Sequence, residues 1–322
     1  MFLPVKTEGC LKLEDLEVKQ MTIKELGLKE SDLEEFVRLN IDDIFEDETL
    51  LIIGQQVINT EKGRCDLVAL DDEGSVVLIE IKRDIADIQS RTEPFEIQAI
   101  RYAANYATIQ SIDEMILKVY SPYISKHKEE FGNFEDEAEF ARKKLIEYLK
   151  ANNAYDSFNK KQRIILIASE FDKQTLSAVA WLITNNVDIA CYKINPIRIA
   201  ENTFLNIERI LPKDKNEDYF VAIDEKGEVI RHLNKKINRT IKPRMKSLFD
   251  AGILKEKDII VFKNKENSDA EVVDYKKVIY QGKEMSYVEW GKLITGWSAV
   301  CIYEWAKKKG EDKTLDDYRD EL

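Results

Sequence analysis

Two apolar runs separated by a four-residue turn constrain this chain more than any other feature. The runs "CDLVAL" (65–70) and "SVVLIEIK" (75–82) flank "DDEG" (71–74), which has the composition of a turn. The pattern predicts an antiparallel hairpin within a sheet. Asp66, Glu80 and Lys82 interrupt these runs, and isolated charges on buried strands are costly unless they are paired or bind a cation. Either the hairpin ends at a solvated sheet edge, or the three charges form a site.

Alternation along a strand decides how these charges are grouped. Glu80 and Lys82 project from one face, about 7 Å apart, and the preceding antiparallel strand places Asp66 beside Glu80. Two adjacent carboxylates repel each other unless a cation lies between them, and Mg²⁺ accepts such ligands together with water and phosphate oxygens. Lys82 would then orient or deprotonate a metal-bound water, or stabilise transition-state charge. The hairpin therefore predicts metal-assisted phosphodiester hydrolysis, with a solvated ion pair at a strand end as the alternative.

Several other classes of protein are disfavoured by what the sequence lacks. It has only two histidines, which disfavours a histidine-based hydrolase. It has neither a GxGxxG fingerprint nor a GxxxxGK[ST] phosphate loop, which disfavours dinucleotide-binding and P-loop enzymes. The cysteines are scattered singly, which is typical of reduced thiols: Cys10, Cys65, Cys191 and Cys301. The first 20 residues lack the apolar core of a signal peptide, and no apolar run reaches membrane-spanning length. We expect a cytoplasmic protein without a membrane partner.

Alternating strand and helix patterns predict the α/β class, with a mixed β-sheet flanked by helices. Strands are expected at 50–58, 163–169 and 187–194, and helices at 31–45, 95–109 and 173–186. The strand–helix–strand unit over 163–194 predicts a parallel pairing. Residues 126–160 have a polar helical pattern and are interpreted as a peripheral insertion.

A polar stretch at 212–218, "PKDKNED", predicts a domain boundary. The expected organisation is a first domain over 1–212, a linker over 213–218 and a small α+β domain over 219–322. In the second domain we expect a helix ended by Gly252, a strand at 258–262, a hairpin around Gln281-Gly282-Lys283 and two short helices. Trp290, Trp297 and Trp305 are interpreted as the core of this domain.

A net charge of −12 is unusual for a nucleic-acid-binding protein, although local fields also steer polyanions. The exception is "RHLNKKINRTIKPRMK" (231–246), which has seven basic residues and no acid. It is either a solvated helix face or a phosphate-binding segment. Read as phosphate-binding, it supplies five candidate DNA contacts, to which Arg64 is added: Lys235, Lys236, Arg239, Lys242 and Arg244.

The segment "GRCDLVALDDEGSVVLIEIKRD" resembles the active-site hairpin of the PD-(D/E)xK, or restriction-endonuclease-like, nuclease superfamily, most closely the branch of NucS-type endonucleases. The resemblance covers about residues 30–212 and implies a restriction-endonuclease-like mixed β-sheet flanked by helices. It implies that Asp66 and Glu80 bind the metal and that Lys82 is the catalytic lysine, with Ile81 also counted as a metal ligand. Cys65 departs from the pattern, because an apolar residue is expected there.

Two helices extend the resemblance beyond the hairpin. Glu34 in "DLEEF" lies where such nucleases place a helical acid that completes the metal shell, with Glu35 as the alternative register. "QAIRYAANYA" is similar to the Gln-x-x-x-Tyr helix of the family, which implies a catalytic role for Gln98. Tyr102 shares its helical face.

Residues 240–308 resemble a RAMA-type domain, on segments such as "SLFDAGIL" and "VIYQGKEMSYVEWGKLITGW", which implies a DNA-recognition module. The combined expectation is an Mg²⁺- or Mn²⁺-dependent DNA endonuclease that forms a homodimer. Two alternatives stay open: a non-catalytic DNA-binding or scaffold protein on a nuclease fold, and an RNA-directed nuclease. Retention of Asp66, Glu80 and Lys82 together disfavours the non-catalytic reading.

Overall fold

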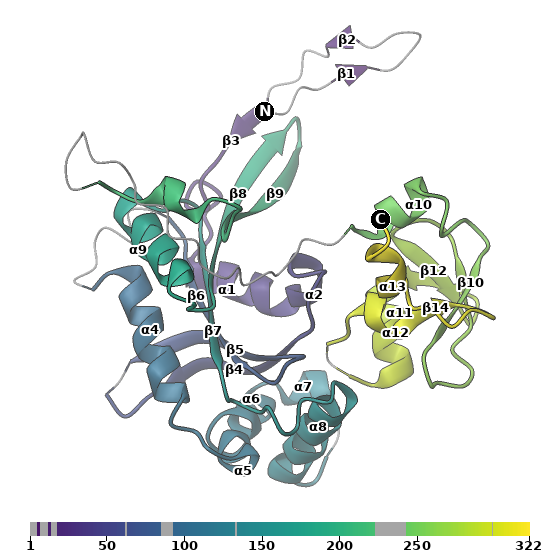
Figure 1. Cartoon of the computed structure of the whole chain (residues 1–322), viewed down its shortest axis with the longest axis horizontal. Helices are drawn as coiled ribbons and strands as arrows, with labels where there is room; N and C mark the ends of the chain where they lie inside the picture. The colour runs from purple at the N-terminus through teal and green to yellow at the C-terminus, as the bar shows by residue number, and fades with distance from the viewer. Residues whose placement is uncertain are drawn as a thin grey trace.

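The computed structural model contains one large and one small body, each built around its own sheet (Figure 1). It describes residues 5–6, 12–13, 18–61, 63–84, 93–132, 134–222, 243–297 and 299–322. At the N-terminus, β1 (Val5–Lys6) and β2 (Lys12–Leu13) pair with each other as a separate two-stranded sheet. Within the described ranges, no helix is long and apolar enough to cross a membrane.

The large body has a mixed seven-stranded sheet in the order β3-β8-β7-β6-β5-β4, with β9 paired to β8. Strands β4, β5 and β6 form an antiparallel meander, whereas β6, β7 and β8 run parallel. The strands are β3 (Val18–Gln20), β4 (Leu50–Ile58), β5 (Arg64–Asp71), β6 (Val76–Lys82), β7 (Gln162–Ala168), β8 (Ile189–Ile199) and β9 (Asn202–Leu211). The mixed sheet flanked by helices is therefore confirmed.

The turn between β5 and β6 explains why the hairpin lies deep in the fold. Gly74 has φ +82°, and a Cβ there would lie 2.8 Å from the carbonyl oxygen of Ala154. Only glycine combines this left-handed backbone with such a close approach. The turn is thus packed beneath the segment after α8, and every residue of β6 is buried.

Helices cover both faces of the sheet. On one face, α4 (Phe95–Tyr106) and α9 (Lys173–Thr184) pack in a cluster with Ile164, Leu166 and Cys191. Residues on the opposite face, such as Ile165 and Ile167, share a core with α1 (Glu30–Leu39), α2 (Ile41–Ile44) and a helical segment. That segment comprises α5 (Ile112–Met115), the π-helix η1 (Ile116–Tyr120), α6 (Ser121–Lys126), α7 (Lys128–Phe131) and α8 (Glu137–Ala151).

The prediction of a peripheral insertion over 126–160 was wrong in place and in kind. The helical segment begins at Ile112 and ends at Ala151. In α8, Ala141, Leu145 and Tyr148 recur at helical spacing and are buried in the main core. Most residues of α8 are polar and face outward, so the sequence signal of the narrow apolar stripe is weak. The stripe covers one face of the sheet.

The segment predicted as a linker, 213–218, packs with the large body. Asn216–Tyr219 is a 3-10 helix, η2, whose Tyr219 packs with Phe220 against the core that contains α9. The backbone N–H of Val221 also donates to Ser177 Oγ at 2.9 Å. Structure that belongs to the large body therefore continues to residue 222, and the stretch between the bodies, 223–242, lies outside the described residues.

The small body is α+β, with an antiparallel sheet in the order β13-β12-β11-β10-β14. Gln281 (φ +50°) and Gly282 (φ +77°) form the expected tight turn between β12 and β13. Trp290 is fully buried in the core and donates from Nε1 to the carbonyl of Ser268, whereas Trp297 and Trp305 are partly buried and pack against that core. The elements are α10 (Met245–Asp250), β10 (Ile259–Phe262), β11 (Ala270–Val272), β12 (Lys277–Tyr280), β13 (Lys283–Ser286), α11 (Tyr287–Thr295), α12 (Ile302–Trp305), β14 (Ala306–Lys308) and α13 (Leu315–Arg319).

Candidate functional site

A pocket of about 380 Å³ opens beside the ends of the β5–β6 hairpin. Three structural units meet there: the start of α1, the hairpin strands with the loop before β5, and the face of α4 that carries Gln98 and Tyr102. Four of the predicted site residues line it, namely Arg64, Asp66, Lys82 and Gln98. The full lining is mostly polar and consists of Glu30, Ile58, Gly63, Arg64, Asp66, Lys82, Gln98 and Tyr102.

Asp66, Glu80 and Lys82 come together as the alternation of the strands predicts. Leu67 pairs with Ile79, so the antiparallel register places Asp66 opposite Glu80. The backbone N–H of Ile81 donates to Asp66 Oδ2 at 2.9 Å and fixes that carboxylate. The side chains of Glu80 and Lys82 are only 0% and 1% exposed. The alternative of a solvated pair at a strand end is therefore wrong.

The Lys82 ammonium lies among three carboxylates. Its Nζ is 3.2 Å from Glu30 Oε1, 3.5 Å from Asp66 Oδ2 and 3.9 Å from Glu80 Oε2. It also lies 5.5 Å from the centre of the Phe95 ring. A buried ammonium needs such compensation, because desolvation of an isolated charge is costly. Lys82 thus supplies a positive charge that offsets part of the charge of the neighbouring acids in this structure.

Glu30 is the residue of this group that the sequence reasoning missed. It begins α1 and stands one helical turn before Glu34, so the spacing of four residues was the available signal. Its Oε2 also lies 3.5 Å from the backbone nitrogen of Arg83. Glu30 therefore connects the start of α1 to the end of β6.

Glu34, and not Glu35, faces the site. The side-chain amide of Gln56 donates to both Glu34 Oε2 and Asp66 Oδ1, the second at 3.2 Å. Burial, followed by the charge of Asp66, raises the pKa of Glu34 to about 7. Glu35 instead forms a bidentate pair with Arg38. The register with Glu34 inward is therefore the one observed.

Gln56 was also missed, and its backbone explains why. The residue has φ +56°, a left-handed backbone conformation that residues other than glycine rarely adopt. It lies in β4, where a regular strand was expected, directly across from Asp66 in the register of β4 and β5. The strain at Gln56 accompanies the placement of its amide between two carboxylates.

Helix α4 contributes the opposite wall through two residues one turn apart. Gln98 Nε2 donates to Tyr102 Oη at 3.1 Å, and the same oxygen accepts the backbone N–H of Arg64 at 2.9 Å. Tyr102 thereby joins α4 to the first residue of β5. The side chain of Arg64 is exposed at the rim of the pocket. Gln98 and Tyr102 share one helical face toward the site, as expected.

Two further residues of the hairpin, Ile81 and Cys65, are apolar or uncharged and lie beside the charged group. The carbonyl of Ile81 faces the site and accepts from Lys82 Nζ, while its side chain lies in the core. Cys65 is buried, as an apolar residue would be. Its burial, reinforced by the charge of Glu80, raises the pKa of the thiol well above its ordinary value.

The predicted phosphate-binding run is described only at its end. Lys235, Lys236, Arg239 and Lys242 lie outside the described residues. Arg244 precedes α10, and its Nη1 is 3.2 Å from Glu46 Oε1 in the large body.

The donor set at the pocket suits a hard divalent cation in chemistry. Glu34, Asp66 and Glu80 supply carboxylate oxygens, and Ile81 supplies a carbonyl oxygen, which are the ligands that Mg²⁺ and Mn²⁺ prefer. In the parts of the chain that the structure describes, no three Asp, Glu, His or Cys side chains are already arranged around one metal position.

No protein-family model matches the chain, and no curated protein matches it either.

Proposed function

We propose that this protein is a metal-dependent endonuclease that hydrolyses phosphodiester bonds in DNA. The observation that carries the proposal is the convergence of the buried Asp66, Glu80 and Lys82 at the end of the β5–β6 hairpin. Asp66 and Lys82 line the pocket, and Gln56 links Glu34 to Asp66. Burial of two like charges and a lysine at one point is expensive, and such expense is typical of catalytic sites. We further propose that the mixed sheet is of the restriction-endonuclease-like kind.

Glu34, Asp66, Glu80 and the Ile81 carbonyl are the groups proposed to hold Mg²⁺ or Mn²⁺. When bound, such an ion supplies polarisation of the scissile phosphate and acidification of the attacking water. These four residues project from α1, β5 and β6, so the fold holds them without loop motion.

Lys82 is proposed to act on the reacting phosphate or on the attacking water. Its Nζ stands at the boundary between the carboxylates and the pocket, with Ile81 and Glu30 as hydrogen-bond acceptors on the protein side. An ammonium in that position stabilises the charge that develops on phosphate oxygens. Gln98 and Tyr102, on the opposite wall, would position the substrate through their amide and hydroxyl groups.

DNA is proposed as the substrate through the basic groups around the pocket. Arg64 stands exposed at the rim, where a phosphate neighbouring the scissile one would pass. The basic run at 231–246 and the small body, read as a RAMA-like domain, would bind the duplex farther from the cut. A cytoplasmic location and a homodimer complete this proposal.

One observation favours a second candidate, a non-catalytic DNA-binding protein on the same fold. Lys82 already compensates Glu30, Asp66 and Glu80, so the carboxylates have a counter-charge without any metal. A scaffold protein would need no more than this. The two candidates differ in whether the protein consumes substrate when the metal is supplied.

The test is a cleavage assay on supercoiled DNA, linear duplex, single-stranded DNA and RNA, each with Mg²⁺, with Mn²⁺ and with EDTA. We expect DNA cleavage in either metal, none in EDTA, and none by Asp66→Asn. Duplex binding without cleavage in every condition would favour the non-catalytic candidate. Cleavage of RNA alone would reassign the substrate.

A further inference from the structure

Among the described residues, three ion pairs join the two bodies, and the large body supplies the acid in each of them. Lys292 Nζ lies 2.6 Å from Asp42 Oδ2, Arg244 pairs with Glu46, and Arg319 Nη2 donates to Asp47 Oδ1. The acids come from one short stretch, residues 42–48, in which five of seven residues are acidic. We call this stretch the acidic segment. The bases come from three different elements of the small body, namely α11, the residue before α10, and α13.

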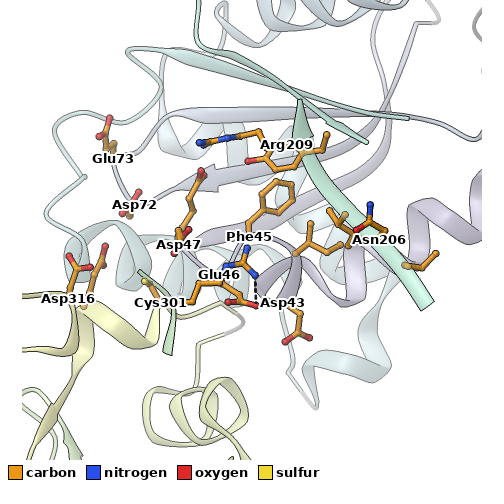
Figure 2. A pocket seen from close by; sticks show the side chains of 17 residues that line it. Asp43, Phe45, Glu46, Asp47, Asp72, Glu73, Asn206, Arg209, Cys301 and Asp316 are labelled. Atoms are coloured by element: carbon orange, nitrogen blue, oxygen red, sulfur yellow. Dashed lines mark hydrogen bonds and ion pairs between the residues drawn. The ribbon is translucent and has the colours of Figure 1, made fainter. Parts of the chain in front are cut away.

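This contact borders a pocket of about 600 Å³ between the bodies (Figure 2). The acidic segment contributes Asp43, Glu46 and Asp47 to its wall, and the small body contributes Cys301 and Asp316. Arg244 and Glu46, which form one of the ion pairs, also line this pocket. The interface therefore encloses solvent-sized space beside its ion pairs, in contrast to the close-packed cores on either side.

A small apolar and polar seam accompanies the ion pairs. Ala299, from the loop between α11 and α12, is 1% exposed and packs with the core of the large body. Lys144 of α8 donates to the carbonyl of Gly296 in the same loop. Each body otherwise has its own core. The contact between the bodies thus combines ion pairs with this small seam.

The environment of the three acids depends on the facing bases. Burial raises the pKa of Asp42, Glu46 and Asp47, and the facing Lys292, Arg244 and Arg319, respectively, lower it. The Arg244–Glu46 pair is well exposed, at 56% and 38% for the two side chains. Exposed pairs of this kind are weak and exchange readily with other anions.

The basic face of the small body is already formed for anion binding. The Arg319 guanidinium lies 3.7 Å from the centre of the Tyr303 ring and donates from Nε to the carbonyl of Pro243, so its orientation is fixed by its own domain. Its Nη1 also pairs with Asp316 at 3.1 Å, so Nη2 is the donor that faces Asp47. A charged donor that pairs with a carboxylate oxygen in this way also pairs with a phosphate oxygen. Arg244 belongs to the basic run of 231–246 in the sequence.

We propose that the acidic segment is an internal competitor for a nucleic-acid backbone, and that it covers the phosphate-binding face formed by Arg244, Lys292 and Arg319 until nucleic acid displaces it. The proposal rests on the assignment of the small body as the DNA-reading part of the proposed nuclease. The docked arrangement is then the resting form. Phosphates exchange for carboxylates at the same three bases, and the two bodies separate as the duplex binds.

The test is duplex affinity in EDTA, where cleavage plays no part. In the full-length protein, Asp42→Asn, Glu46→Gln and Asp47→Asn together should tighten binding of a fluorescent 20-base-pair duplex by at least about fivefold. The matched control removes three exposed acids elsewhere with the same charge change: Asp156→Asn, Glu170→Gln and Glu201→Gln. Small-angle scattering should show a larger radius of gyration for the interface variant than for the control.

The bases provide the second arm. Arg244→Gln with Lys292→Gln, added to the interface variant, should abolish the gain in affinity, and a thermal melt verifies that each variant is folded. Equal affinities of the interface and control variants would overturn the proposal, as would a wild-type protein and an interface variant that both fail to bind duplex at low salt. A protein that binds duplex as expected but never cleaves would leave this proposal standing and remove the nuclease function.

Discussion

At the scale of single residues, the site is organised by the cost of burying charge. Lys82 and Glu80 are buried at the end of one strand, and the Lys82 ammonium offsets part of the charge of Glu80, Asp66 and Glu30. Strand alternation was enough to predict which of these residues meet across the hairpin. Glu30 and Gln56 escaped prediction because their placement depends on where α1 crosses the sheet and on a left-handed residue inside β4.

Glu34 gives the site a pH-dependent stability. Its pKa of about 7 in the folded protein exceeds the ordinary value of 4.5, so the folded state binds more protons than the unfolded state between these values. The stability that this group contributes is complete below about pH 4.5 and is lost as the pH rises through 7. We therefore expect Glu34→Gln to melt at a higher temperature than wild type at pH 8 in EDTA, and close to wild type at pH 5.

Glu35→Gln is the matched control for that measurement. Arg38 lowers the pKa of Glu35 chiefly through a hydrogen bond, so ionised Glu35 stabilises the fold above its ordinary pKa. This variant should melt below wild type at pH 8. If Glu34→Gln is less stable than wild type at pH 8 without metal, ionisation of Glu34 does not destabilise the folded protein.

Asp66 should couple stability to the divalent ion. A ligand that binds only the folded state raises the melting temperature by mass action. We expect millimolar Mn²⁺ to raise the melting temperature of wild type relative to EDTA, and Asp66→Asn to lose this shift. Asp156→Asn, at an exposed position, serves as the control. A full Mn²⁺ shift in Asp66→Asn would remove this residue from the proposed ligand set.

At the scale of elements, the strands were more predictable than the helical segment between α4 and β7. Mostly apolar runs such as β6 predict buried strands from their own sequence, without knowledge of the elements that pack on them. The stripe of α8 is narrow and interrupted by charge, and η1 departs from the α-helical period, so neither gives a strong sequence signal. Their burial becomes evident only when the open face of the sheet is known to require a cover.

Tyr148 tests whether this helical segment supports the hairpin. Tyr148 is 2% exposed, and its hydroxyl oxygen lies 3.0 Å from the carbonyl oxygen of Thr49 and 3.1 Å from that of Leu70. Tyr148→Phe should lower the free energy of unfolding by about 1–2 kcal/mol. Urea denaturation measures this loss, with Tyr155→Phe, at an exposed position, as the control. Equal losses in both variants would mean that the two hydrogen bonds contribute nothing specific.

At the scale of the whole molecule, the two-part organisation was predictable, but the boundary was not. Proline and charged residues after β9 have the composition of a linker, yet Tyr219 and Phe220 lie beyond them and pack on the large body. A polar composition indicates that a segment is exposed to solvent. It does not show on which of the two bodies the aromatic residues after that segment pack. The acidic segment is similarly invisible as an interface, because its partners come from three separate elements.

Two shortened chains test the boundary. A fragment of residues 1–222 keeps η2 and its contact with Ser177, whereas a fragment of residues 1–212 loses them. We expect the longer fragment to unfold cooperatively and the shorter one to melt at a lower temperature, because it exposes the apolar face of α9. Circular dichroism melts of both fragments provide the comparison. Identical melting temperatures would show that 213–222 does not stabilise the large body.

The central claim is that the buried charges of the hairpin form a catalytic site, and Lys82 tests it most directly. The measurement pairs the single-turnover rate of plasmid cleavage in Mg²⁺ with duplex affinity in Ca²⁺, for wild type, Lys82→Met and Lys82→Arg. We expect both variants to lose about 100-fold or more in rate and to keep their affinity, since arginine preserves the charge but not the compact ammonium. A folded Lys82→Met protein that cleaves at nearly the wild-type rate would contradict the account.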